Sequence, residues 1–187
     1  MRHFSSRLGR TVLVCVGLGM AQTAQAGTAA AAGTGYEPMK RFEPVAGKTW
    51  RAKQQNEKGE TVTDISRWEY ILGGKALQVT HSLNAGAYGG RMILFYDEGA
   101  EEYVFYYFTT GGFHTQGTAS FEGNVMTSVE KVSGHENIVE VRATATLTPD
   151  KLTSSSVYVK KDGSTEPGHE FTYKPAPDAE VVFRPAE

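Results

Sequence analysis

Five histidines and a repeated Gly-His-Glu tripeptide are the residues of this chain whose types could bind a metal or a cofactor. The tripeptides, at 134–136 and 168–170, place an imidazole beside a carboxylate, and both groups are metal ligands in proteins. Their spacing matches no known site, and both occur at expected turns or strand starts. We therefore interpret His135 and His169 as solvated loop residues and expect no metal site.

His81 has a more informative setting, because it shares one face of an expected strand with Leu77, Val79 and Leu83. A lone histidine on an apolar face is most often a hydrogen-bonded residue of a core or of its rim, and less often a haem or metal ligand. We take His81 as the polar contact of a candidate binding site.

The motifs of familiar enzymes are absent. Gly47-Lys48-Thr49 imitates the end of a phosphate-binding loop, but Phe42 stands where that loop needs a glycine. The chain has no Gly-x-Ser-x-Gly elbow, and its single cysteine, Cys15, precedes the expected mature chain. Ser154, Ser155 and Ser156 are interpreted as polar strand positions. These absences favour a binding protein over an enzyme and leave activity open.

The charge of the chain argues against a polyanionic partner. The formal net charge is −2, and basic residues occur in no cluster larger than a pair. Nucleic-acid binding needs clustered Lys and Arg, so no nucleic-acid partner is expected.

The first 26 residues have the three parts of a Sec signal peptide: three arginines, an apolar run over 11–20, and the small-x-small cleavage site at 24–26. A membrane span needs about 20 apolar residues, so no integral membrane segment is expected in the mature chain. We expect export to the bacterial periplasm or secretion. Residues 27–41, rich in Ala and Gly, are predicted to be a flexible leader, and 42–187 a single domain.

The expected strands follow from alternation with period two. Residues 138–147 carry Val139, Val141, Ala143, Ala145 and Leu147 on one face and polar side chains on the other. The run 102–109 is aromatic on both faces, which is typical of a strand that is covered on both sides or lines a cavity.

Short turn signals separate these runs. Gly73-Gly74 predicts a two-residue hairpin, and similar Gly- or Asp-containing turns recur along the chain. Because no segment is long enough for a crossover helix, neighbouring strands must be antiparallel. The chain is therefore predicted to be all-β, a single antiparallel up-and-down barrel of about 9 to 11 strands.

Several motifs resemble the DUF1579 family of calycin-like proteins. They are Gly47-Lys48-Thr49-Trp50 after the Phe42/Pro44 lead-in, the run from Arg67 to Leu77, Phe95-Tyr96-Asp97 followed by Tyr103, then Gly112, Gly117 and Asp162-Gly163. The resemblance implies a closed lipocalin-like or nitrobindin-like barrel. Nitrobindin-like relatives bind haem through a late histidine. Glu170-Phe171 after His169 differs from their His-Leu signature, so no haem site is carried over and no cofactor is expected.

These observations favour an exported barrel that binds a small, mostly apolar molecule in its interior. Trp50, at the start of the first strand, is expected to plug one end of the barrel. The candidate ligand-binding residues are Trp68, Tyr70, His81, Phe95, Tyr106 and Phe108. The alternatives are a haem-binding nitrobindin-like protein or small calycin enzyme, and a structural or protein-binding barrel.

The signal-peptide interpretation predicts that the exported protein begins at Gly27. The intact mass of protein recovered from its own compartment tests this. A retained Met1 or a lipid-modified Cys15 would contradict it.

Overall fold

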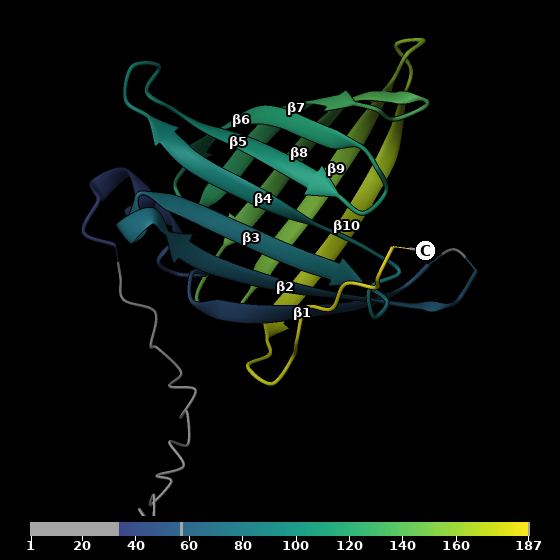
Figure 1. Ribbon diagram of the computed structural model, residues 1–187, viewed down its shortest axis with the longest axis horizontal. Helices are drawn as coiled ribbons and strands as arrows, with labels where there is room; N and C mark the ends of the chain where they lie inside the picture. The colour runs from purple at the N-terminus through teal and green to yellow at the C-terminus, as the bar shows by residue number, and fades with distance from the viewer. Residues whose placement is uncertain (1–33, 57, 187) are drawn as a thin grey trace, which may run out of the picture.

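Ten strands pair with their neighbours in the chain and close into a barrel in the computed structural model, which describes residues 34–56 and 58–186 (Figure 1). The strands are β1 (Lys48–Gln55), β2 (Thr61–Ile71), β3 (Ala76–Leu83), β4 (Tyr88–Asp97), β5 (Glu102–Thr109), β6 (His114–Glu122), β7 (Val125–Ser133), β8 (Ile138–Leu147), β9 (Leu152–Lys160) and β10 (Thr165–Pro175). Two short 3-10 helices, η1 (Glu37–Phe42) and η2 (Leu72–Gly74), complete the elements. The predicted all-β up-and-down barrel is confirmed.

Closure depends on the pairing of the first strand with the last. Trp50, Arg51 and Ala52 of β1 pair antiparallel with Pro175, Lys174 and Tyr173 of β10. Because every strand then has a neighbour on both sides, the sheet has no unpaired edge.

One face of each strand points into the barrel, and a bulge can change which residues do so. In β8 the pairing shifts by one residue between Ile138 and Glu140, and Val139 is 36% exposed. Ala145 and Leu147 are buried. Val141 and Ala143 line the interior, so the expected apolar face of this strand is correct from Val141 to Leu147 and wrong at Val139.

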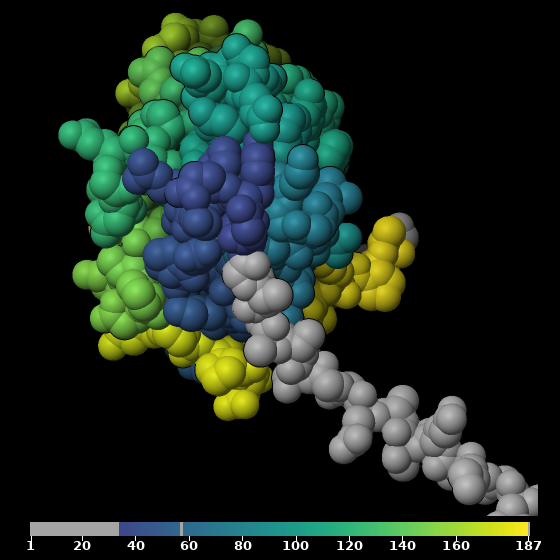
Figure 2. Space-filling model, turned by 90° about the vertical axis from the view of Figure 1, so that its left-hand side faces the viewer, coloured from purple at the N-terminus to yellow at the C-terminus, as the bar shows by residue number. Residues whose placement is uncertain are grey.

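The segment before β1 closes one end of the barrel. Met39, Phe42 and Val45 are completely buried there, and the Phe42 ring meets those of Tyr103 and Phe121 edge-on at 5.5 and 5.3 Å between centroids. Figure 2 views the barrel from this end, where the purple N-terminal segment lies across the middle of the face.

Two tyrosine hydroxyls hold this segment in place. Tyr70 donates a hydrogen bond to the Met39 carbonyl at 2.9 Å, and Tyr103 donates one to the Pro38 carbonyl at 2.5 Å. Residues 34–41 therefore belong to the folded unit, which corrects their assignment to a flexible leader. Residues 27–33 and the expected signal peptide lie outside the described residues.

Trp50 lies in the core at this closed end. Its side chain is completely buried, and its indole Nε1–H donates to the Val45 carbonyl at 3.2 Å. A large ring that is buried and hydrogen-bonded in this way has the placement that a plug needs.

The connection between β2 and β3 differs from the expected two-residue hairpin. It runs over 72–75 as a four-residue loop, in which Leu72, Gly73 and Gly74 have φ of 51°, 65° and 87°. The Thr34 hydroxyl donates to the Gly74 carbonyl at 2.8 Å, and a Cβ at Gly74 would lie 2.6 Å from that hydroxyl oxygen.

We predict that Gly74→Val destabilises the protein more than Gly73→Val. Both substitutions add a β-branched residue at positive φ, which costs about 1–2 kcal/mol, but only Gly74→Val also collides with Thr34, because a Cβ at Gly73 has nothing within 4 Å. Thermal or urea unfolding of both variants measures the difference. Equal stability of the two variants would show that the Thr34 contact contributes nothing.

Candidate functional site

The barrel encloses a cavity of about 560 Å³ that reaches from Trp68 to the end opposite η1. Its walls are largely apolar, with Val79, Met126 and Leu152 among them, and Phe113 and His135 line it from the β5–β6 and β7–β8 loops. The polar side chains that line it are Asp64, Ser66, His81, Tyr88, Tyr107, Thr115, Ser128, Glu130, His135, Ser154, Tyr158, His169 and Tyr173. Volume and lining are those of a small-molecule pocket.

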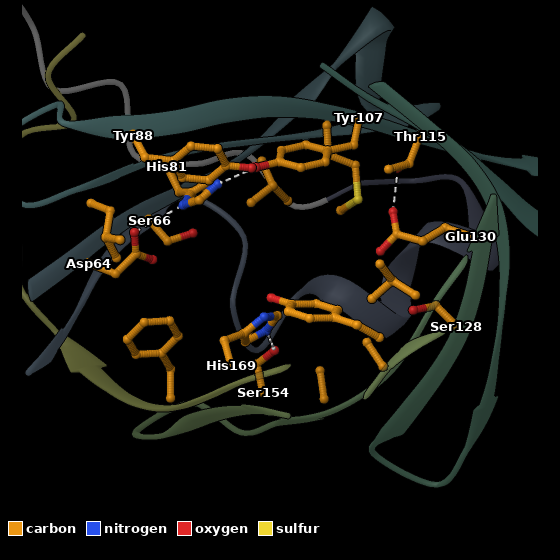
Figure 3. A pocket seen from close by; sticks show the side chains of 18 of the residues that line it. Asp64, Ser66, His81, Tyr88, Tyr107, Thr115, Ser128, Glu130, Ser154 and His169 are labelled. Atoms are coloured by element: carbon orange, nitrogen blue, oxygen red, sulfur yellow. Dashed lines mark hydrogen bonds and ion pairs between the residues drawn. The ribbon is translucent and has the colours of Figure 1, made fainter. Parts of the chain in front are cut away.

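A chain of hydrogen bonds runs along one wall of this cavity (Figure 3). Asp64, only 1% exposed, lies 2.9 Å from Nδ1 of His81, and Nε2 of His81 lies 2.6 Å from the Tyr107 hydroxyl. The Tyr107 hydroxyl is 3.2 Å from that of Tyr88, and Tyr173 donates to the second Asp64 oxygen at 2.7 Å.

Two small residues allow this series of hydrogen bonds to cross strands. Gly90 of β4 pairs with His81 of β3, and a Cβ on it would lie 2.4 Å from the Tyr107 ring of β5. Ala52 of β1 has the same place between Asp64 and Tyr173, since it pairs with both. Larger side chains at either position would separate the partners on the two flanking strands.

Burial shifts the acidity of these hydroxyls. It raises the pKa of Tyr107, and the neighbouring Tyr88 hydroxyl adds to the rise. It also raises the pKa of Tyr173, with the Asp64 carboxylate adding to it. Both phenols therefore stay protonated at neutral pH and donate hydrogen bonds, Tyr173 to the Asp64 carboxylate and Tyr107 to the His81 imidazole.

His169 lies on another wall, where a bulge in β10 places it. Between Pro167 and Glu170 two residues of β10 oppose Ser156 of β9. The imidazole Nε2 is 2.9 Å from the Ser154 hydroxyl, and Nδ1 is 3.0 Å from that of Ser156. Burial lowers the pKa of His169, and the nearby His81 lowers it further, so the ring is neutral at pH 7.

Glu130 of β7 is a further ionisable group of the cavity lining. The Thr115 hydroxyl donates to its Oε2, and no partner for Oε1 is found among the residues that the structure describes. Burial raises the pKa of Glu130, and the hydrogen bond from Thr115 opposes this rise.

The candidate ligand-binding residues divide into two groups. Trp68 and His81 line the cavity, and Tyr70 contacts the core at the closed end, where it binds the Met39 carbonyl. The others lie on the outer surface: Phe95, Tyr106 and Phe108 are 38%, 38% and 55% exposed. Their expected place in the interior is therefore corrected.

For Tyr106 and Phe108 the reason for this correction lies in β5. Both of its faces carry aromatic rings, so its pattern could not show which face points inward. The structure turns Tyr103, Phe105 and Tyr107 to the interior.

His169, Ser154 and Ser156 were not among the predicted site residues. His169 was expected in a loop, and the two serines were interpreted as polar strand positions. The spacing of the two serines on an alternating strand was a usable signal for one shared face. The bulge that brings His169 to the same face could not be predicted from the sequence, because Gly168 is as typical of a turn as of a bulge.

No group of three or more His, Cys, Asp or Glu side chains that could hold a metal ion occurs in residues 34–56 and 58–186. In the same part of the chain, no helix has the length and apolar character required to span a bilayer.

Comparison with known proteins supports the fold. No family model and no curated protein matches the sequence, so the DUF1579 resemblance stays a prediction. Among solved structures the chain is similar to Rv2717c from Mycobacterium tuberculosis, with a TM-score of 0.57 over 75% of this chain and 98% of that chain. The sequence identity is 10%, so the likeness shows the fold alone.

We predict that Gly90→Ala lowers stability by about 1–3 kcal/mol, the usual cost of overpacking, because its methyl group displaces the Tyr107 ring from His81. Urea denaturation measures the loss. Gly35→Ala is the control, since a Cβ there meets nothing within 4 Å. A Gly90→Ala protein as stable as this control would mean that the ring and the strand can move apart freely.

The neutral buried His169 predicts a loss of stability on acidification. Its pKa is lower in the folded protein than in the unfolded chain, so the unfolded state binds the proton more readily as the pH falls below about 6.5. The free energy of unfolding should fall there by up to about 1.4 kcal/mol per pH unit on account of this group. His169→Gln should remove this part of the slope and the outer-face His114→Gln should not; identical slopes in both variants refute the assignment.

Proposed function

We propose that the protein is an exported barrel, periplasmic or secreted, that binds a small, mostly apolar molecule in its interior. The observation that carries this proposal is the cavity of about 560 Å³ with mainly apolar walls. A cavity of this size that stayed empty would forgo the contacts that otherwise stabilise a protein core, and an apolar ligand supplies them.

The distribution of side chains supports the same function. One end of the barrel is filled by Met39, Phe42 and Trp50, so the cavity is closed on that side. At the other end it is bordered by Phe113 and His135, which belong to loops. A site with a rigid floor and a mouth formed by loops is a common arrangement for ligand entry.

The polar groups on the walls would orient such a ligand. The hydroxyls of Tyr88 and Tyr107 and the carboxyl of Glu130 are among the polar groups of a lining whose surface is mainly apolar. A few convergent polar groups in an apolar pocket fix orientation and provide specificity.

Haem is a second candidate, and His169 favours it. A neutral imidazole inside an apolar cavity is the form in which histidine binds iron. His169 would be the residue that holds the iron, because its Nε2 is engaged only by the Ser154 hydroxyl, which can rotate. Bound haem would supply ligand-binding or redox chemistry. The imidazole of His81 is less suited, since its two nitrogens contact Asp64 and Tyr107.

We predict that a neutral fluorescent apolar probe binds the protein and that Trp68→Ala weakens this binding. Trp50→Ala should instead cost about 3–5 kcal/mol of stability through the cavity that it leaves in a filled region. Phe108→Ala, on the outer surface, is the matched aromatic control and should change neither quantity. Probe titration and thermal melting of the three variants measure both effects.

The same preparation separates the candidates. Absence of probe binding to the parent protein, with equal destabilisation by Trp50→Ala and Trp68→Ala, would indicate a filled barrel and a structural role. A stoichiometric Soret band on haem addition that is lost in His169→Ala would favour the haem protein.

A further inference from the structure

The ionisable groups inside the cavity are unbalanced in sign. Its lining contains two carboxyl groups, from Asp64 and Glu130, but none of the lining residues in the described part of the chain is Lys or Arg. Besides hydroxyl groups and three histidines, the interior therefore offers carboxyl acceptors for hydrogen bonds but no permanent positive charge.

The two carboxyl groups are not equivalent. Both oxygens of Asp64 are engaged, one by His81 and the other by Tyr173, and the residue is almost completely buried. Glu130 receives one hydrogen bond, from Thr115 to Oε2, and its Oε1 remains accessible to the cavity. Glu130 is therefore the group that can contact the polar end of a ligand.

An anionic ligand has no counter-charge in this interior. Burying a carboxylate or phosphate away from water is costly unless a cation or several donors pair with it. The backbone N–H groups that surround the cavity are used in the pairing of ten strands. A negative ligand would also be repelled by the Glu130 and Asp64 carboxyl groups.

A donor-bearing ligand meets the opposite situation. An ammonium group carries three N–H donors and a positive charge, and a charge-assisted hydrogen bond to a carboxylate is stronger than a neutral one. The neighbouring hydroxyls of Thr115 and Ser128 can accept the remaining donors.

We propose that the cavity selects apolar ligands whose polar end donates hydrogen bonds, an aliphatic amine above all, with Glu130 as its contact, and excludes apolar carboxylates and phosphates. This inference rests on the proposed binding function. It adds the chemical class of the ligand and the residue that determines it.

The experiment compares decylamine, decanol and decanoate, which share one chain length, as competitors of a neutral fluorescent apolar probe at pH 7. Decylamine should displace the probe at a concentration at least about tenfold lower than decanoate, with decanol between them. Decanoate that competes as well as decylamine, or better, overturns the inference while leaving the proposed function intact. A probe that does not bind the parent protein overturns both.

Two variants assign the preference to Glu130. Glu130→Gln should weaken decylamine binding about tenfold and leave decanol binding nearly unchanged, because only the charge-assisted contact is lost. Glu122→Gln, an exposed carboxyl outside the cavity, makes the same change of charge and should have no effect. Equal amine binding by both variants overturns the role of Glu130. The ranking of the three competitors on the parent protein decides the ligand class even if Glu130→Gln fails to fold.

Discussion

Three residue pairs between β1 and β10 turn a ten-stranded sheet into a barrel, and the character of its interior follows from this closure. The circumference of a closed sheet is determined by the number and tilt of its strands, so its interior cannot shrink to fit the side chains. Here η1 and the core around Trp50 fill one end, and a cavity of about 560 Å³ remains beyond Trp68. The cavity is thus a consequence of the closed architecture and not a separate addition to it.

The polar groups of the interior are arranged as burial requires. A buried carboxyl group without partners is costly, and Asp64 meets this requirement with donors from two other strands, His81 on β3 and Tyr173 on β10. The contact of Asp64 with Tyr173 crosses β1 at Ala52, and that of His81 with Tyr107 crosses β4 at Gly90, because the inward residue between the partners is small at both positions. The same network that satisfies Asp64 therefore also ties together the strands that close the barrel.

The likeness to Rv2717c concerns the fold alone. At 10% identity the two chains share the closed barrel, while the side chains inside it need have nothing in common. Unrelated functions occur on a common fold, so the chemistry of this protein has to be argued from its own interior. Among the described residues that line that interior are two carboxyl groups and no Lys or Arg, and the proposed ligand class rests on this imbalance.

Much of the architecture was predictable from local sequence, because alternation and turn residues are local properties. They were enough for the all-β barrel, the antiparallel order and the apolar setting of His81, which does line the cavity.

The inward face of β5 was not predictable in this way, because both of its faces carry aromatic rings. Tyr107 lies inside and Tyr106 outside, and this depends on the register of β5 against the neighbouring strands. The position of His169 depends on a bulge of β10 opposite Ser156 of β9. Such a bulge is defined by the pairing of two strands, so the sequence of one strand does not reveal it. Residues 34–41 contain too few apolar residues to be predicted as ordered. They fold because the open end of the barrel offers an apolar surface on which Met39 is buried. Local patterns thus predicted which segments are strands, whereas only the assembled barrel decided which side chains share its interior.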